Sequence, residues 1–166
     1  MKLLFILLLS GWLFIPVSAQ TSHDMYTYKQ IGNKYVVSIQ NREEIVEALN
    51  AFCEERGIKS GTIYGIGAID ELILRFFNPQ TKQYVDKTYQ EQMEIANLTG
   101  NISQMEGKAY LHLHVTVGRS DYSALAGHLL SATLNGAGEF VVEDLGTTVT
   151  RVYVPEIGLN CYKLDE

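Results

Sequence analysis

Residues 110–117 are the most informative segment of this chain and read Tyr110-Leu111-His112-Leu113-His114-Val115-Thr116-Val117. Successive side chains of a β-strand point to opposite faces of the sheet. The leucines and valines therefore share one face, and this apolar face is expected to pack into the core. His112 and His114 share the other face with Tyr110 and Thr116. The stretch predicts a central strand that holds two imidazoles side by side.

A third histidine, His128, follows in the segment Gly127-His128-Leu129, so three of the four histidines of the chain lie within 17 residues. Three neutral imidazoles with a free fourth position are the ligand set of an open zinc site. A zinc ion bound there would acidify water toward neutral pH. Spacing alone leaves a second interpretation open, in which these histidines are structural and form ordinary hydrogen bonds. The candidate metal ligands are His112, His114 and His128.

Four further residues are candidates to complete this site. Glu94 is the candidate catalytic carboxylate, because its strand is expected to pair with the histidine strand. It would serve as a fourth ligand, orient a ligand or carry a proton. Tyr110 and Thr116 would line the pocket, and Arg119 would bind the carboxylate of a substrate.

Strand signals outnumber helix signals along the rest of the chain. One clear amphipathic helix is expected over residues 41–56, with Asn41 as its N-cap, Glu44 in a capping box and Gly57 at its end. A small-residue-rich element is expected over 123–130 and a turn at 136–138. The remaining strands are predicted over 26–30, 35–40, 61–77, 84–89, 92–103, 131–134, 139–145, 149–153 and 158–164. The pattern predicts an α+β fold, a curved and mainly antiparallel sheet or barrel with one main helix packed on it.

The segment Gly65-Ile66-Gly67 invites comparison with dinucleotide-binding loops. A third glycine is missing, since Asp70 stands in its place, and no helix follows. A pair of glycines inside a strand more often marks a bulge or a close backbone approach. A bulge is therefore expected here.

The first 19 residues have the pattern of a secretory signal peptide. Lys2 precedes an apolar run of about 13 residues, and Val17-Ser18-Ala19 resembles a cleavage site. An uncleaved anchor is the alternative, but the run is shorter than the roughly 20 residues that span a bilayer. Residues 20–166 would then form a single exported domain, periplasmic or secreted, without a further membrane segment.

Charge and cysteine content narrow the expected partners. The formal net charge is −6, and loss of Lys2 with the signal peptide makes it −7. No basic stripe of the kind that binds nucleic acid is present, so a nucleic-acid partner is disfavoured. The two cysteines, Cys53 and Cys161, either form a disulfide, which export permits, or remain separate thiols.

Five motifs occur in an order that resembles the plants and prokaryotes conserved (PPC) domain, over about residues 28–164. They are Gly65-Ile66-Gly67-Ala68, Glu94-Ile95 with Leu98-Thr99-Gly100-Asn101-Ile102-Ser103, Leu111-His112-Leu113-His114-Val115, Gly127-His128-Leu129 and Glu139. The family usually has a glycine where this chain has Ala126, which is a small departure.

The resemblance implies an antiparallel fold of strands and one helix that assembles as a homotrimer. Plant members carry an AT-hook that binds DNA, and no Arg-Gly-Arg hook occurs here. Stand-alone bacterial members are often labelled DNA-binding. The fold also resembles acetolactate decarboxylase, in which three histidines hold a catalytic zinc, but that link is an analogy of fold. Three hypotheses follow: a trimeric binding or scaffold module, a metal-dependent enzyme acting on a small carboxylate-bearing molecule, and a DNA-binding protein.

Overall fold

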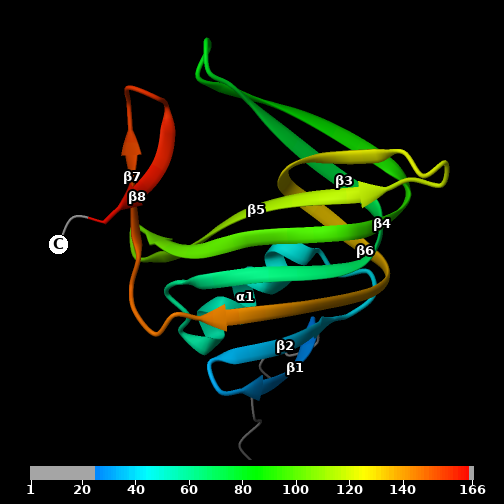
Figure 1. The fold of residues 1–166 in the computed structure, drawn as a ribbon, viewed down its shortest axis with the longest axis horizontal. Helices are drawn as coiled ribbons and strands as arrows, with labels where there is room; N and C mark the ends of the chain where they lie inside the picture. Colours follow the sequence, from blue (N-terminus) through cyan, green and yellow to red (C-terminus); the bar gives the residue numbers. More distant parts are fainter. Residues whose placement is uncertain (1–24, 165–166) are drawn as a thin grey trace, which may run out of the picture.

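The computed structural model describes residues 25–164, and the predicted signal peptide lies outside them. One helix and eight strands follow in the order β1 (Tyr26–Ile31), β2 (Lys34–Ile39), α1 (Ile45–Arg56), β3 (Gly61–Asn78), β4 (Gln83–Met105), β5 (Lys108–Gly118), β6 (Ala124–Asp144), β7 (Thr150–Val154) and β8 (Leu159–Lys163). The predicted α+β class, with one helix packed on a curved antiparallel sheet, is confirmed (Figure 1).

Four long strands close into a ring, because β6 pairs with both β3 and β5. Its first residues, from Ala124 to His128, lie opposite β5, and the remainder of β6 lies opposite β3. Strand β4 pairs with β3 on one side and with β5 on the other. The β1–β2 hairpin extends the sheet from the end of β6, and β7–β8 joins it beside β4. The barrel-like closure that the sequence predicts is therefore present.

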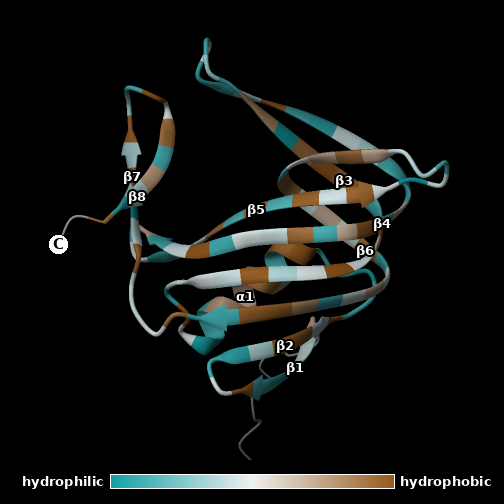
Figure 2. Cartoon of the chain, in the orientation of Figure 1, coloured by the Kyte–Doolittle hydropathy of each residue, from teal (hydrophilic) through white to brown (hydrophobic). Residues whose placement is uncertain are grey.

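The histidine strand is anchored through its apolar face. Leu113, Val115 and Val117 are 1%, 2% and 0% exposed, as their alternation with polar residues predicts. Brown and paler segments alternate along β5 in the hydropathy view (Figure 2). The side chains on the other face of β5 are consequently held at fixed positions.

Helix α1 covers one side of the sheet, behind the strands in Figure 1. Phe52 is fully buried and meets the rings of Tyr26, Tyr28 and Tyr35 edge-on, with centroids 5.3–5.5 Å apart. Gly57 ends the helix in the left-handed conformation, as predicted.

The predicted start of the helix is wrong. The helix begins at Ile45, and Glu44 is its N-cap, with a carboxylate that accepts a hydrogen bond from the backbone N–H of Glu47. Asn41 instead accepts a hydrogen bond from the backbone N–H of Gly136 on β6. The side chain of Asn41 is therefore used in a contact with β6 and is not available to cap the helix.

Several predicted breaks in the strands are absent. Residues 84–89 and 92–103 form the single strand β4. Residues 124–144, predicted as a small-residue-rich element, a strand, a turn at 136–138 and another strand, form the single strand β6. Bulges interrupt the pairing near both places without ending the strands. The predicted bulge at Gly65 and Gly67 is confirmed by a register shift between those two residues.

Two further observations concern the predictions about cysteines and membranes. Cys53 and Cys161 are both free thiols, so of the two alternatives the structure has separate thiols. Within residues 25–164, no helix combines the length and the apolar character needed to cross a bilayer.

Candidate metal centre

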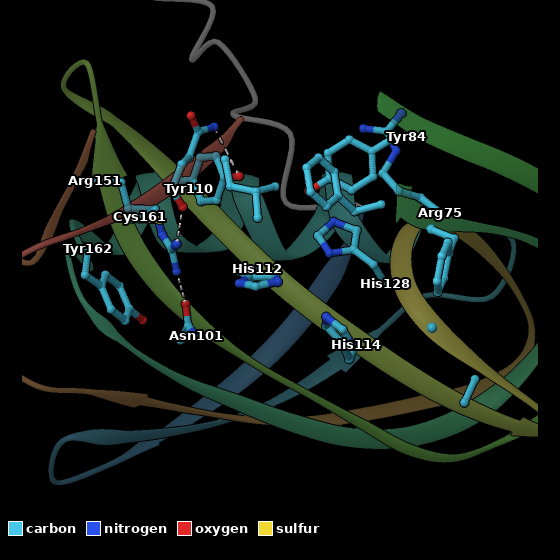
Figure 3. A pocket seen from close by; sticks show the side chains of 16 residues that line it. Arg75, Tyr84, Asn101, Tyr110, His112, His114, His128, Arg151, Cys161 and Tyr162 are labelled. Carbon is cyan, nitrogen blue, oxygen red and sulfur yellow. Dashed lines mark hydrogen bonds between the residues drawn. The ribbon is translucent and has the colours of Figure 1, made fainter. Parts of the chain in front are cut away.

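The three predicted histidines meet on the face of the sheet opposite the core. His112 and His114 are neighbours on the outer face of β5, and His128 lies directly across from His114 on β6. The ring centroids are 5.0–5.4 Å apart in all three pairs. One ligand nitrogen from each ring lies within 4.8 Å of the others. Figure 3 shows the three imidazoles converging.

This spacing fits a metal ion of the zinc type. With Zn–N bonds of about 2.0–2.1 Å, the nitrogens of a tetrahedral centre lie about 3.4 Å apart. In this structure the three nitrogens lie within 4.8 Å of one another, so they would move closer together on binding the ion. No fourth side chain from residues 25–164 joins the cluster, so the ligand set is of the open kind.

The surroundings of His112 and His128 favour the neutral imidazole, which is the form that binds metals. Burial lowers the pKa of His112, and the positive charge of Arg151 and the neighbouring His114 lower it further. Burial, His112, His114 and Arg75 together lower the pKa of His128 to about 4. A neutral imidazole is the ligand form, so neither ring has to release a proton near neutral pH before a metal binds.

The histidines lie in a pocket of about 660 Å³. One wall comes from the hairpin between β3 and β4 and carries Phe76, Phe77 and Tyr84. The opposite wall comes from β7 and β8 and carries Arg151 and Tyr162. The tips of these hairpins are joined, since Lys82 Nζ donates a hydrogen bond of 2.8 Å to the carbonyl oxygen of Pro155. The volume is typical of a site for a small molecule.

Two arginines of this pocket have different partners. Arg75 donates two 2.8 Å hydrogen bonds to Asp86, and this pairing lowers the pKa of the Asp86 carboxyl group. Arg151 donates instead to neutral groups, Ser103 Oγ, Asn101 Oδ1 and the carbonyl oxygen of Asn160, each at 2.8 Å. The pocket therefore contains one guanidinium with a carboxylate partner and one without.

The predicted accessory residues are only partly at the site. Tyr110 lines the pocket, as expected. Thr116 is half-buried further along β5, outside the pocket lining. Arg119 also lies outside it and forms an ion pair with Glu91, with Nη2 and Oε1 2.9 Å apart.

Glu94 does not line the histidine pocket. Its strand pairs with β5 as predicted, but Glu94 lies opposite Gly118, four residues beyond His114. At about 3.3 Å per residue this is about 13 Å along the strand. Glu94 lines a separate hollow with Glu139. Thr99 and Asn101 are the β4 residues that lie opposite the two histidines of β5.

Arg151, Arg75, Tyr84 and Tyr162 are site residues that the sequence patterns did not indicate. Each is far from the histidines in the sequence. Arg75 lies directly opposite His128 across β3 and β6, and the other three belong to the β3–β4 and β7–β8 hairpins. One signal was available. Arg151 is the only charged residue in a short run of strand-forming residues, and an arginine that is buried with such a strand needs polar partners.

Solved structures resemble this chain along nearly their whole length. A Bacteroides thetaiotaomicron protein, provisionally named DNA-binding, is 71% identical, with a TM-score of 0.83; the match covers 84% of this chain and 98% of that protein's chain. A Ralstonia eutropha protein with a similar provisional name is 30% identical, with a TM-score of 0.78; the match covers 83% of this chain and 96% of that protein's chain. An Archaeoglobus fulgidus protein described as metal-containing is 28% identical, with a TM-score of 0.74 and coverage of 82% and 98%.

Among curated proteins, none matches this sequence significantly. The sequence profile of the Plants and Prokaryotes Conserved domain, abbreviated PCC or PPC, matches residues 26–146. This range contains the closed ring of strands, the helix and all three histidines. The chain therefore belongs to the Plants and Prokaryotes Conserved domain family.

Proposed function

We propose that this protein binds a divalent transition-metal ion, with zinc as the best chemical match, through His112, His114 and His128. The observation that carries the proposal is the convergence of three ligand nitrogens within 4.8 Å of one another. A set of three neutral imidazoles suits zinc and leaves one coordination position for a ligand. The metal-containing relative from Archaeoglobus fulgidus adds support.

Elemental analysis of the purified protein tests this proposal. Wild type, dialysed against zinc and then against buffer, should retain about one ion per chain. The variants His112→Ala and His114→Ala should retain much less, while circular dichroism shows that they are folded. Wild type without stoichiometric metal, or variants that keep it, would refute the metal site.

The function that we infer is a binding module, in which the metal and the pocket hold a small molecule. A metal-dependent enzyme acting on a small carboxylate-bearing molecule is the second candidate, favoured by the open ligand set and the adjoining pocket. Bound zinc would supply Lewis-acid chemistry there. No Asp or Glu of residues 25–164 lines the pocket, and Asp86, the carboxylate near His128, is already paired with Arg75; this supports the binding module.

We also propose that the protein is a homotrimer, as the family resemblance implies. Support comes from the outer face of β2, β3 and β6, where Val36, Tyr64 and Ile66 are 46%, 46% and 53% exposed beside an apolar groove of about 570 Å³. Exposed apolar patches of this kind are typical of contacts between subunits. A second copy of the chain would cover these side chains.

Light scattering coupled to size exclusion tests the trimer. Wild type should have three times the mass of one chain at micromolar concentration. Tyr64→Glu combined with Ile66→Glu should lower the mass, because it places two charges in the patch. Tyr122→Glu is the matched control, since Tyr122 is 96% exposed on the loop between β5 and β6. A monomeric wild type would contradict the proposal.

We further propose that the protein is exported and that nucleic acid is not its partner. The signal-like residues 1–19 support a periplasmic or secreted location, which fractionation of the expressing cells would test. The net charge of −6 argues against DNA as the partner, despite the provisional names of two relatives. A gel shift at low salt would reverse that conclusion if the protein bound duplex DNA.

A further inference from the structure

Arg151 is a buried charge at the edge of the histidine pocket. It is 8% exposed and extends from β7 toward β4, where it reaches Ser103 and Asn101 (Figure 3). Its guanidinium carbon lies 4.1 Å from the ring centroid of Tyr162 and 5.0 Å from that of Tyr110. Rings at these distances stabilise a guanidinium but do not neutralise it.

In the described part of the chain, no acidic side chain pairs with this charge. Within residues 25–164, Arg151 forms no ion pair, and the pocket lining contains two arginines, three histidines and neither Asp nor Glu. Arg75, the other arginine, has Asp86 as its partner. A buried charge without a counter-charge is costly, so an anion from solution is the natural partner for Arg151.

Arg151 also has donors to spare. A guanidinium has five N–H groups, and three are used in the hydrogen bonds to Ser103, Asn101 and Asn160. One N–H remains on Nη1 and one on Nη2. Two donors at the end of a guanidinium are the number that the two oxygens of a carboxylate can accept from.

The metal site increases the need for an anion. Arg151 lies near His112, because Asn101, which accepts a hydrogen bond from Arg151, lies directly opposite His112 across β4 and β5. A divalent cation on the three imidazoles would therefore lie near a guanidinium in a pocket without carboxylates, and the two charges repel each other. An anion bound between them attracts both.

We propose that the pocket binds a small organic carboxylate, that Arg151 anchors the carboxylate group, and that the remainder of the ligand contacts the apolar wall of Phe76, Phe77 and Tyr84. This inference rests on the proposed metal site for the position of the ligand beside the histidines. Its anchor, however, is Arg151, which acts whether or not a metal is present. Arg151 thus replaces Arg119 as the residue that would recognise a carboxylate.

Isothermal titration calorimetry with benzoate and its neutral isostere benzamide tests the anchor. Benzoate combines a planar carboxylate with an apolar ring, and benzamide keeps the shape without the charge. Metal-free wild type should bind benzoate about tenfold or more tightly than benzamide, the scale of a charge-assisted hydrogen bond. Equal binding of the two probes, or binding of neither, would overturn the proposal.

Arg151→Gln and Arg119→Gln form a matched pair of variants. Arg151→Gln should weaken benzoate binding about tenfold or more, whereas Arg119→Gln should change it little, because Arg119 lies outside the pocket and is paired with Glu91. An Arg151→Gln variant that binds benzoate as wild type does would overturn the proposal. If zinc-loaded wild type and zinc-loaded Arg151→Gln bind benzoate equally, the carboxylate is bound by the metal. That result would overturn the role of Arg151 and leave the metal site in place.

A purely structural role for Arg151 is separated by two further variants. Ser103→Ala removes one of its hydrogen bonds but leaves the charge in place, so benzoate binding should persist. Arg151→Lys keeps the positive charge but lacks the paired N–H donors of the guanidinium, and it replaces Arg151→Gln if that variant does not fold. Arg151→Lys should bind benzoate more weakly than Ser103→Ala does. If Arg151→Lys binds benzoate more tightly than Ser103→Ala, the guanidinium donors do not bind the carboxylate.

Discussion

His114 and His128 lie directly opposite each other across β5 and β6, with ring centroids 5.4 Å apart. The hairpin that joins the two strands turns at the loop of residues 119–123, and the two histidines are equally distant from its centre. A gap of 14 residues in the sequence thus becomes a contact across one pair of strands. His112, two residues before His114 on the same face, completes the cluster.

The metal site should depend on the histidines and not on the face of β5 as a whole. His114→Asn should weaken zinc binding by about a hundredfold or more, since loss of a ligand costs at least as much as loss of its supporting contacts. Thr116→Val changes a residue on the same face outside the pocket and should leave affinity unchanged. Competition with a chromogenic chelator measures both variants. Equal losses in the two would indicate that the strand is disturbed and that no specific ligand is involved.

Gly100 should be required for the approach of β4 to the histidine strand. A Cβ at this position would clash with the backbone carbonyl oxygen of His112 and would lie 2.6 Å from Cδ2 of Leu113. Gly100→Ala should therefore lower the free energy of unfolding by about 1–3 kcal/mol or more and displace His112. Gly107→Asn is the matched control, because its left-handed turn has open space and asparagine tolerates that conformation. Urea denaturation of the two variants would contradict the account if they were equally stable.

The two cysteines should differ in reactivity. Burial raises the pKa of the Cys53 thiol to about 12, so at pH 8 this residue is almost entirely in the unreactive thiol form. Cys161 is only partly buried in the pocket wall. Iodoacetamide at pH 8 should modify Cys161 in the folded protein and both cysteines in urea. Mass spectrometry of tryptic peptides measures this, and labelling of Cys53 in the native state would be the contrary result.

Glu44 should contribute to stability through both of its carboxylate oxygens. One accepts a hydrogen bond from the backbone N–H of Glu47 at the start of α1, and the other accepts from the N–H of Ala132 on β6. Glu44→Ala should cost about 1–2 kcal/mol in thermal or urea unfolding, the scale of a lost N-cap. Glu43→Ala changes the preceding carboxylate and should cost less. Equal free energies of unfolding for the two variants would show that the contacts of Glu44 do not stabilise the protein.

Strand alternation predicted that His112 and His114 share a face, and His128 joins them because β6 forms a hairpin with β5, where the sequence had indicated only a short small-residue-rich element. Leu113 and Val115 indicate which face is buried, so the faces of His112 and His114 follow directly. Glu94 shows the limit of this reasoning. Its strand does pair with β5, but the register, shifted by a bulge between Ile95 and Asn97, places it opposite Gly118.

Long-range contacts account for the other differences. Asn41 has the residue type of an N-cap, yet its side chain binds the backbone of β6, and Glu44 takes over the cap. Arg151 reaches the pocket only through the docking of β7 and β8, which no local pattern predicts. Periodicity describes what one strand or helix does by itself, whereas these contacts depend on how distant elements meet.

Anomalous diffraction at the zinc edge, from crystals of the zinc-loaded protein, would locate the metal. We expect one strong anomalous peak per chain, bonded to one nitrogen each of His112, His114 and His128 at about 2.0–2.1 Å. A peak bonded to other residues, or none between these three imidazoles, would contradict the proposed metal site.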